Sequence, residues 1–163
     1  ILFESISIRD IHTILGTLLT ESGKTQNPDE LTELVRPRLG HLMLQEIIEL
    51  GDTLNVITLD PKLEQMLISS ITQSAKIGEV VIEPNLAEGL LDSVKKEKED
   101  AENQGHPAVI VVAPPIRPWL ARMIKQRFSE TTILSYTEIP EDQKIKVFAR
   151  IGVTDETQEE NQQ

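Results

Sequence analysis

The feature that most constrains the fold is an uninterrupted apolar run at residues 108–112, which the pair Pro114-Pro115 ends. Its four consecutive β-branched residues favour an extended strand, and a strand that is apolar on both faces must be buried on both sides. A helical pattern through Leu120 and Ile124 follows, and residues 131–136 are predicted to form a second strand. Because strand, helix and strand in this order close as a right-handed parallel crossover, this part of the chain is predicted to be α/β.

The first half of the chain shows helical spacing instead. Ser7 is the expected N-cap of a first helix, and Asn27-Pro28 opens a second one. Pro37 falls inside the second pattern, where the helix either kinks or gives way to a new helix. Residues 54–59 are short and β-branched, as expected of a single strand. The buried stripe expected on the first helix consists of Ile8, Ile11, Ile14, Leu15, Leu18 and Leu19.

Two further segments complete the predicted fold. An amphipathic helix is expected over residues 84–105, and residues 144–150 alternate as in a half-exposed strand with Ile145, Val147 and Ala149 pointing inward. We therefore expect an α+β fold, with a mainly helical subdomain over residues 1–80 that includes one short strand. A small α/β subdomain with a roughly three-stranded mixed sheet is expected over residues 81–153. Residues 154–163 are acidic, and we expect them to form a disordered tail.

Composition restricts the classes of function. The 163 residues carry 16 Lys and Arg against 27 Asp and Glu, a net charge of −11, which disfavours a nucleic-acid partner. The absence of Cys excludes a disulfide scaffold, a thiol nucleophile and a cysteine-ligated metal. No apolar stretch is long enough to cross a bilayer, and a start at Ile1 is expected of a fragment of a longer protein.

The residue types that catalysis needs are not gathered in recognisable motifs. His12, His41 and His106 are scattered and lack the i, i+4 spacing of a metal-binding helix. No serine lies in a G-x-S-x-G or S-x-x-K motif. The turn after residues 108–112 contains three prolines and no glycine, so it lacks backbone donors that could cradle a phosphate. We therefore expect no enzymatic activity, no metal and no cofactor.

Four cations gather around one predicted helix in this acidic chain: Arg117, Arg122, Lys125 and Arg127. Three interpretations are open for them. They form an ordinary solvated helix face, a docking patch for an acidic partner or a neighbouring subunit, or a nucleic-acid patch. We take them as a candidate docking patch.

Six segments, taken in order, resemble one protein family. They are SIRDIHTIL (residues 7–15), DELTELVR (29–36), VITLDPKLEQ (56–65), IEPNLA (82–87), IRP (116–118) and ILSYTEIP (133–140). With them the chain resembles the C-terminal cytoplasmic region of the FHIPEP family, the flagellar and injectisome export-gate proteins of type III secretion. The resemblance covers nearly the whole chain except its tail.

The resemblance implies a non-catalytic part of a nonameric ring at the cytoplasmic face of the bacterial inner membrane, anchored through a preceding part of the protein. It implies a scaffold and docking platform for export substrates, chaperones and ATPase-complex components, in either a flagellar or an injectisome system. In this family the helical subdomain contributes to contacts between ring neighbours. The candidate subunit-interface residues are therefore the charges of the first two helices: Arg9, Asp10, Arg36 and Arg38. For Arg9 and Asp10, helix capping and an internal ion pair are the alternative.

A second class of function stays open beside the first. A small ligand-binding or enzymatic α/β domain would hold its ligand beyond the C-terminal ends of the strands, near Ala113 and Tyr136. The lack of glycine at this turn and of clustered titratable side chains disfavours this alternative.

Overall fold

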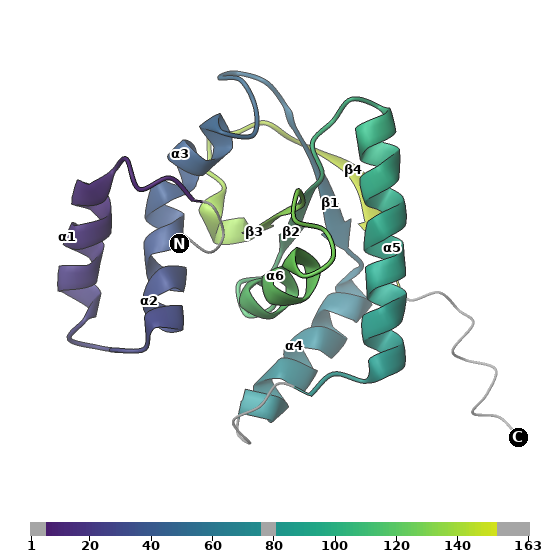
Figure 1. The fold of residues 1–163 in the computed structure, drawn as a ribbon, viewed down its shortest axis with the longest axis horizontal. Helices are drawn as coiled ribbons and strands as arrows, with labels where there is room; N and C mark the ends of the chain where they lie inside the picture. Colours follow the sequence, from purple (N-terminus) through teal and green to yellow (C-terminus); the bar gives the residue numbers. More distant parts are fainter. Residues whose placement is uncertain (1–5, 76–80, 153–163) are drawn as a thin grey trace, which may run out of the picture. The chain divides into compact units, whose positions relative to one another are not determined.

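The computed structural model describes residues 6–75 and 81–152 and divides the chain into two compact units (Figure 1). Unit 1 consists of Ile1–Leu54 and Ser135–Lys144, and unit 2 consists of Asn55–Leu134 and Ile145–Gln163. The chain therefore leaves unit 1, forms most of unit 2, and returns to unit 1 before its last strand.

Unit 1 is built from short helices. They are α1 (Ile11–Glu21), α2 (Pro28–Val35), η2 (Arg36–Leu39), α3 (Gly40–Gln45) and η3 (Tyr136–Glu138). Asp10, and not the expected Ser7, is the N-cap of α1, because its carboxylate accepts a hydrogen bond from the backbone of Thr13. Asn27 caps α2 with Pro28 in its first turn, as the sequence predicts.

Pro37 separates α2 from α3. Because proline has no N–H to donate to the carbonyl of Glu33, α-helical bonding cannot continue through this position. The chain instead forms the 3₁₀ turn η2 and resumes as α3 at Gly40, so the second of the two predicted alternatives is the one found. The buried apolar side chains of unit 1 include Ile14, Val35, Leu39, Met43, Leu44 and Leu54.

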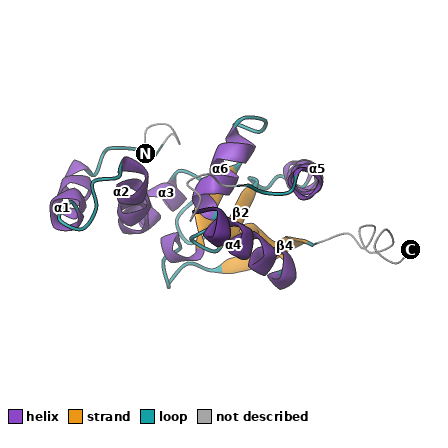
Figure 2. Ribbon diagram, turned by 90° about the horizontal axis from the view of Figure 1, so that it is seen from below, coloured by secondary structure: helices purple, strands orange, loops and turns teal. Residues whose placement is uncertain are grey.

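Unit 2 is an α/β unit. Its elements are β1 (Leu54–Leu59), α4 (Pro61–Ala75), α5 (Pro84–Asn103), β2 (Val109–Val112), α6 (Arg117–Lys125), β3 (Thr132–Ser135) and β4 (Ile145–Ile151). Figure 2 shows the strands together with α4, α5 and α6. The division expected at residue 80 lies outside the described residues, but the helices on its two sides, α4 and α5, both belong to unit 2. The expected tail over residues 154–163 also lies outside the described residues.

The sheet has four parallel strands in the order β3-β2-β1-β4. Ile57 of β1 lies opposite Ile110 of β2, and the backbone N–H of Asp60 donates to the carbonyl of Ile151 at the end of β4 over 2.6 Å. The expected three-stranded mixed sheet is therefore corrected. The segment at residues 54–59 is a strand as predicted, but it is an inner strand of the sheet, because an isolated strand would leave its backbone groups unpaired.

The core of unit 2 lies around β2, whose four residues are all buried, as the apolar run predicts. Helices contribute the residues Leu63, Leu67, Leu90, Leu91, Val94, Leu120, Ala121 and Ile124 to this core. Burying such side chains stabilises the fold by about 1.5–3 kcal/mol each. In the described residues no helix combines the length and apolar character needed to cross a bilayer.

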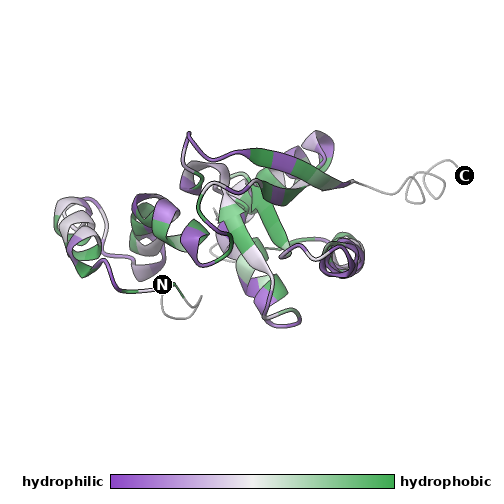
Figure 3. Ribbon diagram, turned by 90° about the horizontal axis from the view of Figure 1, so that it is seen from above, coloured by the Kyte–Doolittle hydropathy of each residue, from purple (hydrophilic) through white to green (hydrophobic). Residues whose placement is uncertain are grey.

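The last strand differs from the prediction in its side chains. Figure 3 shows apolar and polar residues alternating along β4, which is the strand that leads to the C-terminus. Ile145 and Val147, however, are 48% and 50% exposed, so the expectation that both point inward is wrong. The core reaches β4 only at Phe148, Ala149 and Ile151, because β4 is the edge strand of the sheet and its first half lies beyond the packed residues.

Candidate interaction surfaces

Asp10 has a structural role at the start of α1. Its carboxylate accepts hydrogen bonds from the backbone N–H of Thr13 over 3.1 Å and from the Thr13 hydroxyl over 2.6 Å. The hydroxyl bond first, and then the backbone bond, hold the pKa of Asp10 below its ordinary value of 3.8. The capping alternative is thus confirmed for Asp10, while a role of Asp10 or the exposed Arg9 at a subunit interface stays a prediction.

Arg36 is not an exposed charge, and that expectation is wrong. Its Nε donates to Oε1 of Glu138 over 2.8 Å and its Nη2 donates to Oε2 over 3.0 Å, with the side chains only 3% and 1% exposed. The partner lies 102 residues away in the sequence, so spacing along α2 could not indicate the pair. The guanidinium and carboxylate form a bidentate pair that joins η2 to η3 within unit 1.

Gly40 completes the same junction. A Cβ added at this position would collide with the backbone oxygen of Glu138, so only glycine allows η3 to approach α3 this closely. Sequence reasoning did not single out Gly40 or Glu138 as functional positions. The sequence feature that could have drawn attention to Glu138 is the segment at residues 133–140, which contains it and carries part of the family resemblance.

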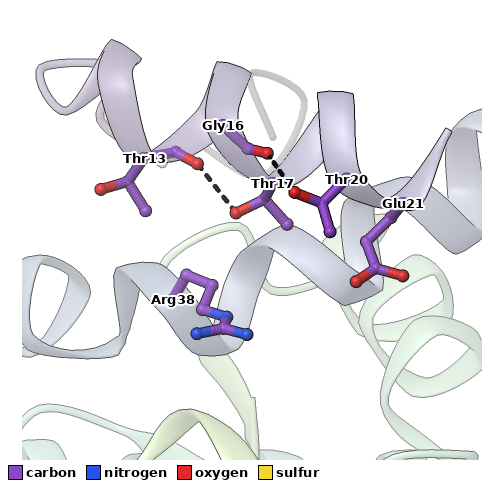
Figure 4. A pocket seen from close by; sticks show the side chains of 6 residues that line it. All are labelled: Thr13, Gly16, Thr17, Thr20, Glu21 and Arg38. Carbon is purple, nitrogen blue, oxygen red and sulfur yellow. Dashed lines mark hydrogen bonds between the residues drawn. The ribbon is translucent and has the colours of Figure 1, made fainter.

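Arg38 lies beside a groove in unit 1. The groove has a volume of about 290 Å³ and is lined by Thr13, Gly16, Thr17, Thr20, Glu21 and Arg38. Figure 4 shows Arg38 opposite the α1 side chains. The threonine hydroxyls bond to their own helix, Thr17 to the carbonyl of Thr13 over 2.8 Å and Thr20 to the carbonyl of Gly16 over 2.9 Å. Two hydroxyls of this shallow groove are therefore already hydrogen-bonded within α1, and Arg38 provides an exposed charge beside them.

The α1 stripe is a candidate surface that the sequence analysis assigned to the core. We define it as Ile8, Ile11, Leu15 and Leu19, whose side chains are 43% to 81% exposed. Of the six apolar residues expected to be buried, only Ile14 is, because α1 packs against α2 and η2 on one side and leaves its other side exposed. Residues 11, 15 and 19 repeat at i, i+4 spacing and so lie on one side of the helix.

The candidate docking patch on α6 loses one of its four members. Arg117 is 1% exposed and belongs to the interior, so its inclusion in an exposed patch is wrong. Arg122 and Arg127 are exposed, and Lys125 is half-buried with its Nζ donating to the carbonyl of Ser129 over 3.3 Å. We call the remaining cations, Arg122 and Lys125 of α6 and Arg127 just after it, the basic surface of α6, and its docking role stays a prediction.

The alternative ligand site at the strand ends is weakened by the local hydrogen bonding. A ligand beyond β2 would need the backbone N–H of Ala113, but this group already donates to Oε1 of Glu64 over 2.8 Å. Tyr136, the other proposed position, belongs to unit 1 and not to the unit that contains Ala113. Within residues 6–75 and 81–152, no three His, Asp or Glu side chains gather as metal ligands would.

Sequence comparison identifies the class of protein: the chain belongs to the FHIPEP family, which it matches over residues 1–144. The flagellar biosynthesis protein FlhA of Buchnera aphidicola subsp. Acyrthosiphon pisum is 35% identical over 154 residues. The match covers 94% of this chain and 22% of that relative, so the chain spans about a fifth of the length of the curated relatives that it matches.

Solved structures of type III secretion proteins share the fold. The nonameric SctV-C of EPEC, determined by cryo-EM, superposes with a TM-score of 0.75 at 29% identity, over 91% of this chain and 44% of that one. The CdsV protein of Chlamydia pneumoniae, solved in complex with CdsO, gives a TM-score of 0.71 at 27% identity, over 91% of this chain and 44% of that one.

Proposed function

We propose that the chain is a non-catalytic part of the cytoplasmic ring of a type III protein export gate at the bacterial inner membrane. In this role it is a scaffold and a docking platform for export substrates, chaperones and ATPase-complex components. The single observation that carries the proposal is the α1 stripe, an apolar helix face that unit 1 leaves exposed. An exposed apolar patch of this kind is often a functional contact surface, and the nonameric assembly of SctV-C supports a second copy as its cover.

The size of the α1 stripe sets the expected strength of self-association. Four partly exposed side chains offer an area on the order of a few hundred Å², below the roughly 800 Å² per partner of a stable interface. This chain alone is therefore expected to associate weakly, with further parts of the longer protein completing the ring. Arg9 is an exposed charge next to Ile8 and would form part of the polar rim of such a contact, whereas Arg38 lies at the groove on the opposite, threonine-bearing side of α1.

A substitution on the stripe tests this role. Sedimentation velocity over a concentration series should show reversible association that Leu15→Glu combined with Leu19→Glu abolishes, because a buried unpaired carboxylate opposes docking. Leu50→Glu is the matched control, since Leu50 is a 91% exposed leucine of unit 1 outside the stripe. Equal association of the stripe variant and the control would refute the α1 contact. A strictly monomeric protein, even with its natural preceding residues restored, would refute the ring.

The basic surface of α6 is the proposed site for an acidic partner. The complex of CdsV with CdsO supports the idea that proteins with this fold bind other proteins. Arg122→Glu combined with Arg127→Glu should weaken binding of an ATPase-complex component, and the wild-type affinity should fall as salt is raised. Binding that is unaffected by both the charge reversal and salt would exclude this surface as the docking site.

A further inference from the structure

The outer edge of β4 is the second surface that the fold leaves open. β4 is the last strand in the sheet order, so within the described part of the chain only β1 pairs with it, and its outer backbone groups have no sheet partner. With seven residues, β4 is also the longest of the four strands. An added strand could therefore pair with this edge over several residues.

The first half of β4 is open on both faces as well as at its edge. Ile145, Lys146 and Val147 are all exposed, although neighbouring residues of a strand point to opposite faces. α5 packs near β4, but core packing begins only at Phe148. A segment lying beside residues 145–147 could thus make backbone hydrogen bonds and cover two apolar side chains.

The side chains along this edge favour one chemistry of partner. Lys146 and Arg150 of β4 are exposed, as is Lys144 directly before it, and β4 contains no acidic residue in a chain whose net charge is −11. Ile145 and Val147 lie between them in sequence and provide apolar contact. An extended segment with alternating acidic and apolar residues would complement both features.

We propose that β4 is a strand-addition site for an extended, acidic segment of a partner protein. Backbone hydrogen bonds to the sheet edge supply most of the affinity, and the cations select for carboxylates. This site goes beyond the ring-scaffold role, because it neither uses the α1 stripe nor requires a second copy. The competing explanation is protective: charged residues on an edge strand prevent unwanted pairing, and lysine is common in that role. The two explanations predict opposite results with peptides.

The test uses the whole chain and a six- to eight-residue peptide that alternates glutamate with valine or threonine. The carbonyl of Lys144 accepts from Leu54 of β1, so the amides of Ile145 and Val147 point to the outer edge. Their hydrogen exchange, followed by NMR, should slow about tenfold when the free peptide is ten times its dissociation constant. The same peptide with N-methyl groups on alternate residues should give no protection, because methylation removes the donors that pair with the edge. A peptide with lysine in place of glutamate should bind at least tenfold more weakly.

A matched pair of protein variants locates the site. Lys146→Glu should weaken the acidic peptide at least tenfold, whereas Lys96→Glu, an exposed lysine of α5, should change its affinity less than twofold. Three results would overturn the proposal. They are the absence of any binding, which the protective explanation predicts, equal binding of the N-methylated peptide, and an equal response of the two lysine variants.

Discussion

Replacement of Glu138 by glutamine tests whether the buried ion pair holds the two chain segments of unit 1 together. Both side chains are almost fully buried, and two hydrogen bonds of 2.8 and 3.0 Å join them. Removing one partner of a buried pair leaves the other charge uncompensated, which costs roughly 3–5 kcal/mol. Glutamine keeps the shape of the side chain and one accepting oxygen. We therefore expect a loss of stability at the lower end of this range, about 3 kcal/mol.

Amide hydrogen exchange provides the measurement at the level of unit 1. A loss of about 3 kcal/mol should speed the opening of α2 by roughly 100-fold, visible at the amide of Leu31, which donates to the carbonyl of Asn27 over 2.9 Å. Glu102→Gln is the control, because Glu102 pairs with Lys98 on the exposed face of α5 and surface pairs contribute about 0–1 kcal/mol.

A double variant separates the buried charge from the packing around it. Arg36→Met combined with Glu138→Leu removes both charges of the pair, so its loss of stability should be smaller than that of Glu138→Gln alone. The reasoning is refuted if Glu138→Gln destabilises unit 1 by less than about 1 kcal/mol, or if the double variant is the less stable of the two.

Three further predictions follow from single positions. Gly40→Ala should destabilise unit 1 by about 1–3 kcal/mol in urea unfolding, whereas Gly89→Ala, where an added methyl meets no atom, should stabilise α5 by about 0.5–1 kcal/mol. The lowered pKa of Asp10 makes its contribution to stability fully present above pH 3.8 and lost below it, so Asp10→Asn should have its smallest effect in acid-unfolding curves below that pH. Leu120 is fully buried and Leu50 is 91% exposed. In urea unfolding, Leu120→Ala should therefore lower the free energy of unfolding by about 2–5 kcal/mol, and Leu50→Ala by less than about 0.5 kcal/mol.

Local patterns predicted most of the individual elements. The apolar run gave β2 its place in the core, and the helix expected over residues 84–105 is α5 within two residues. These elements depend on periodicity and capping, which neighbouring residues determine. Sequence reasoning did not indicate that residues 54–59 form an inner strand of the four-stranded sheet, because strand order depends on distant pairing. No local pattern records that β1 lies between β2 and β4.

The candidate sites were harder to predict than the fold. Arg36 and Arg117 resemble ordinary surface cations in the sequence, yet both are buried. Burial of a charge requires a partner, and for Arg36 that partner comes from a remote turn. The α1 stripe illustrates the opposite error. Its helical spacing is that of a core helix, but periodicity identifies an apolar face without showing what covers it.

The return of residues 135–144 to unit 1 affects how this unit folds while the chain is being synthesised. The N-terminal helices leave the ribosome first, but Glu138 emerges about a hundred residues later than Arg36. At translation rates of roughly 5–20 residues per second, the arginine waits on the order of ten seconds for its carboxylate. During that interval α2 and α3 lack their final contacts, so chaperone capture or proteolysis of the nascent chain should concentrate there, and a stop codon before Ser135 would make that exposure permanent.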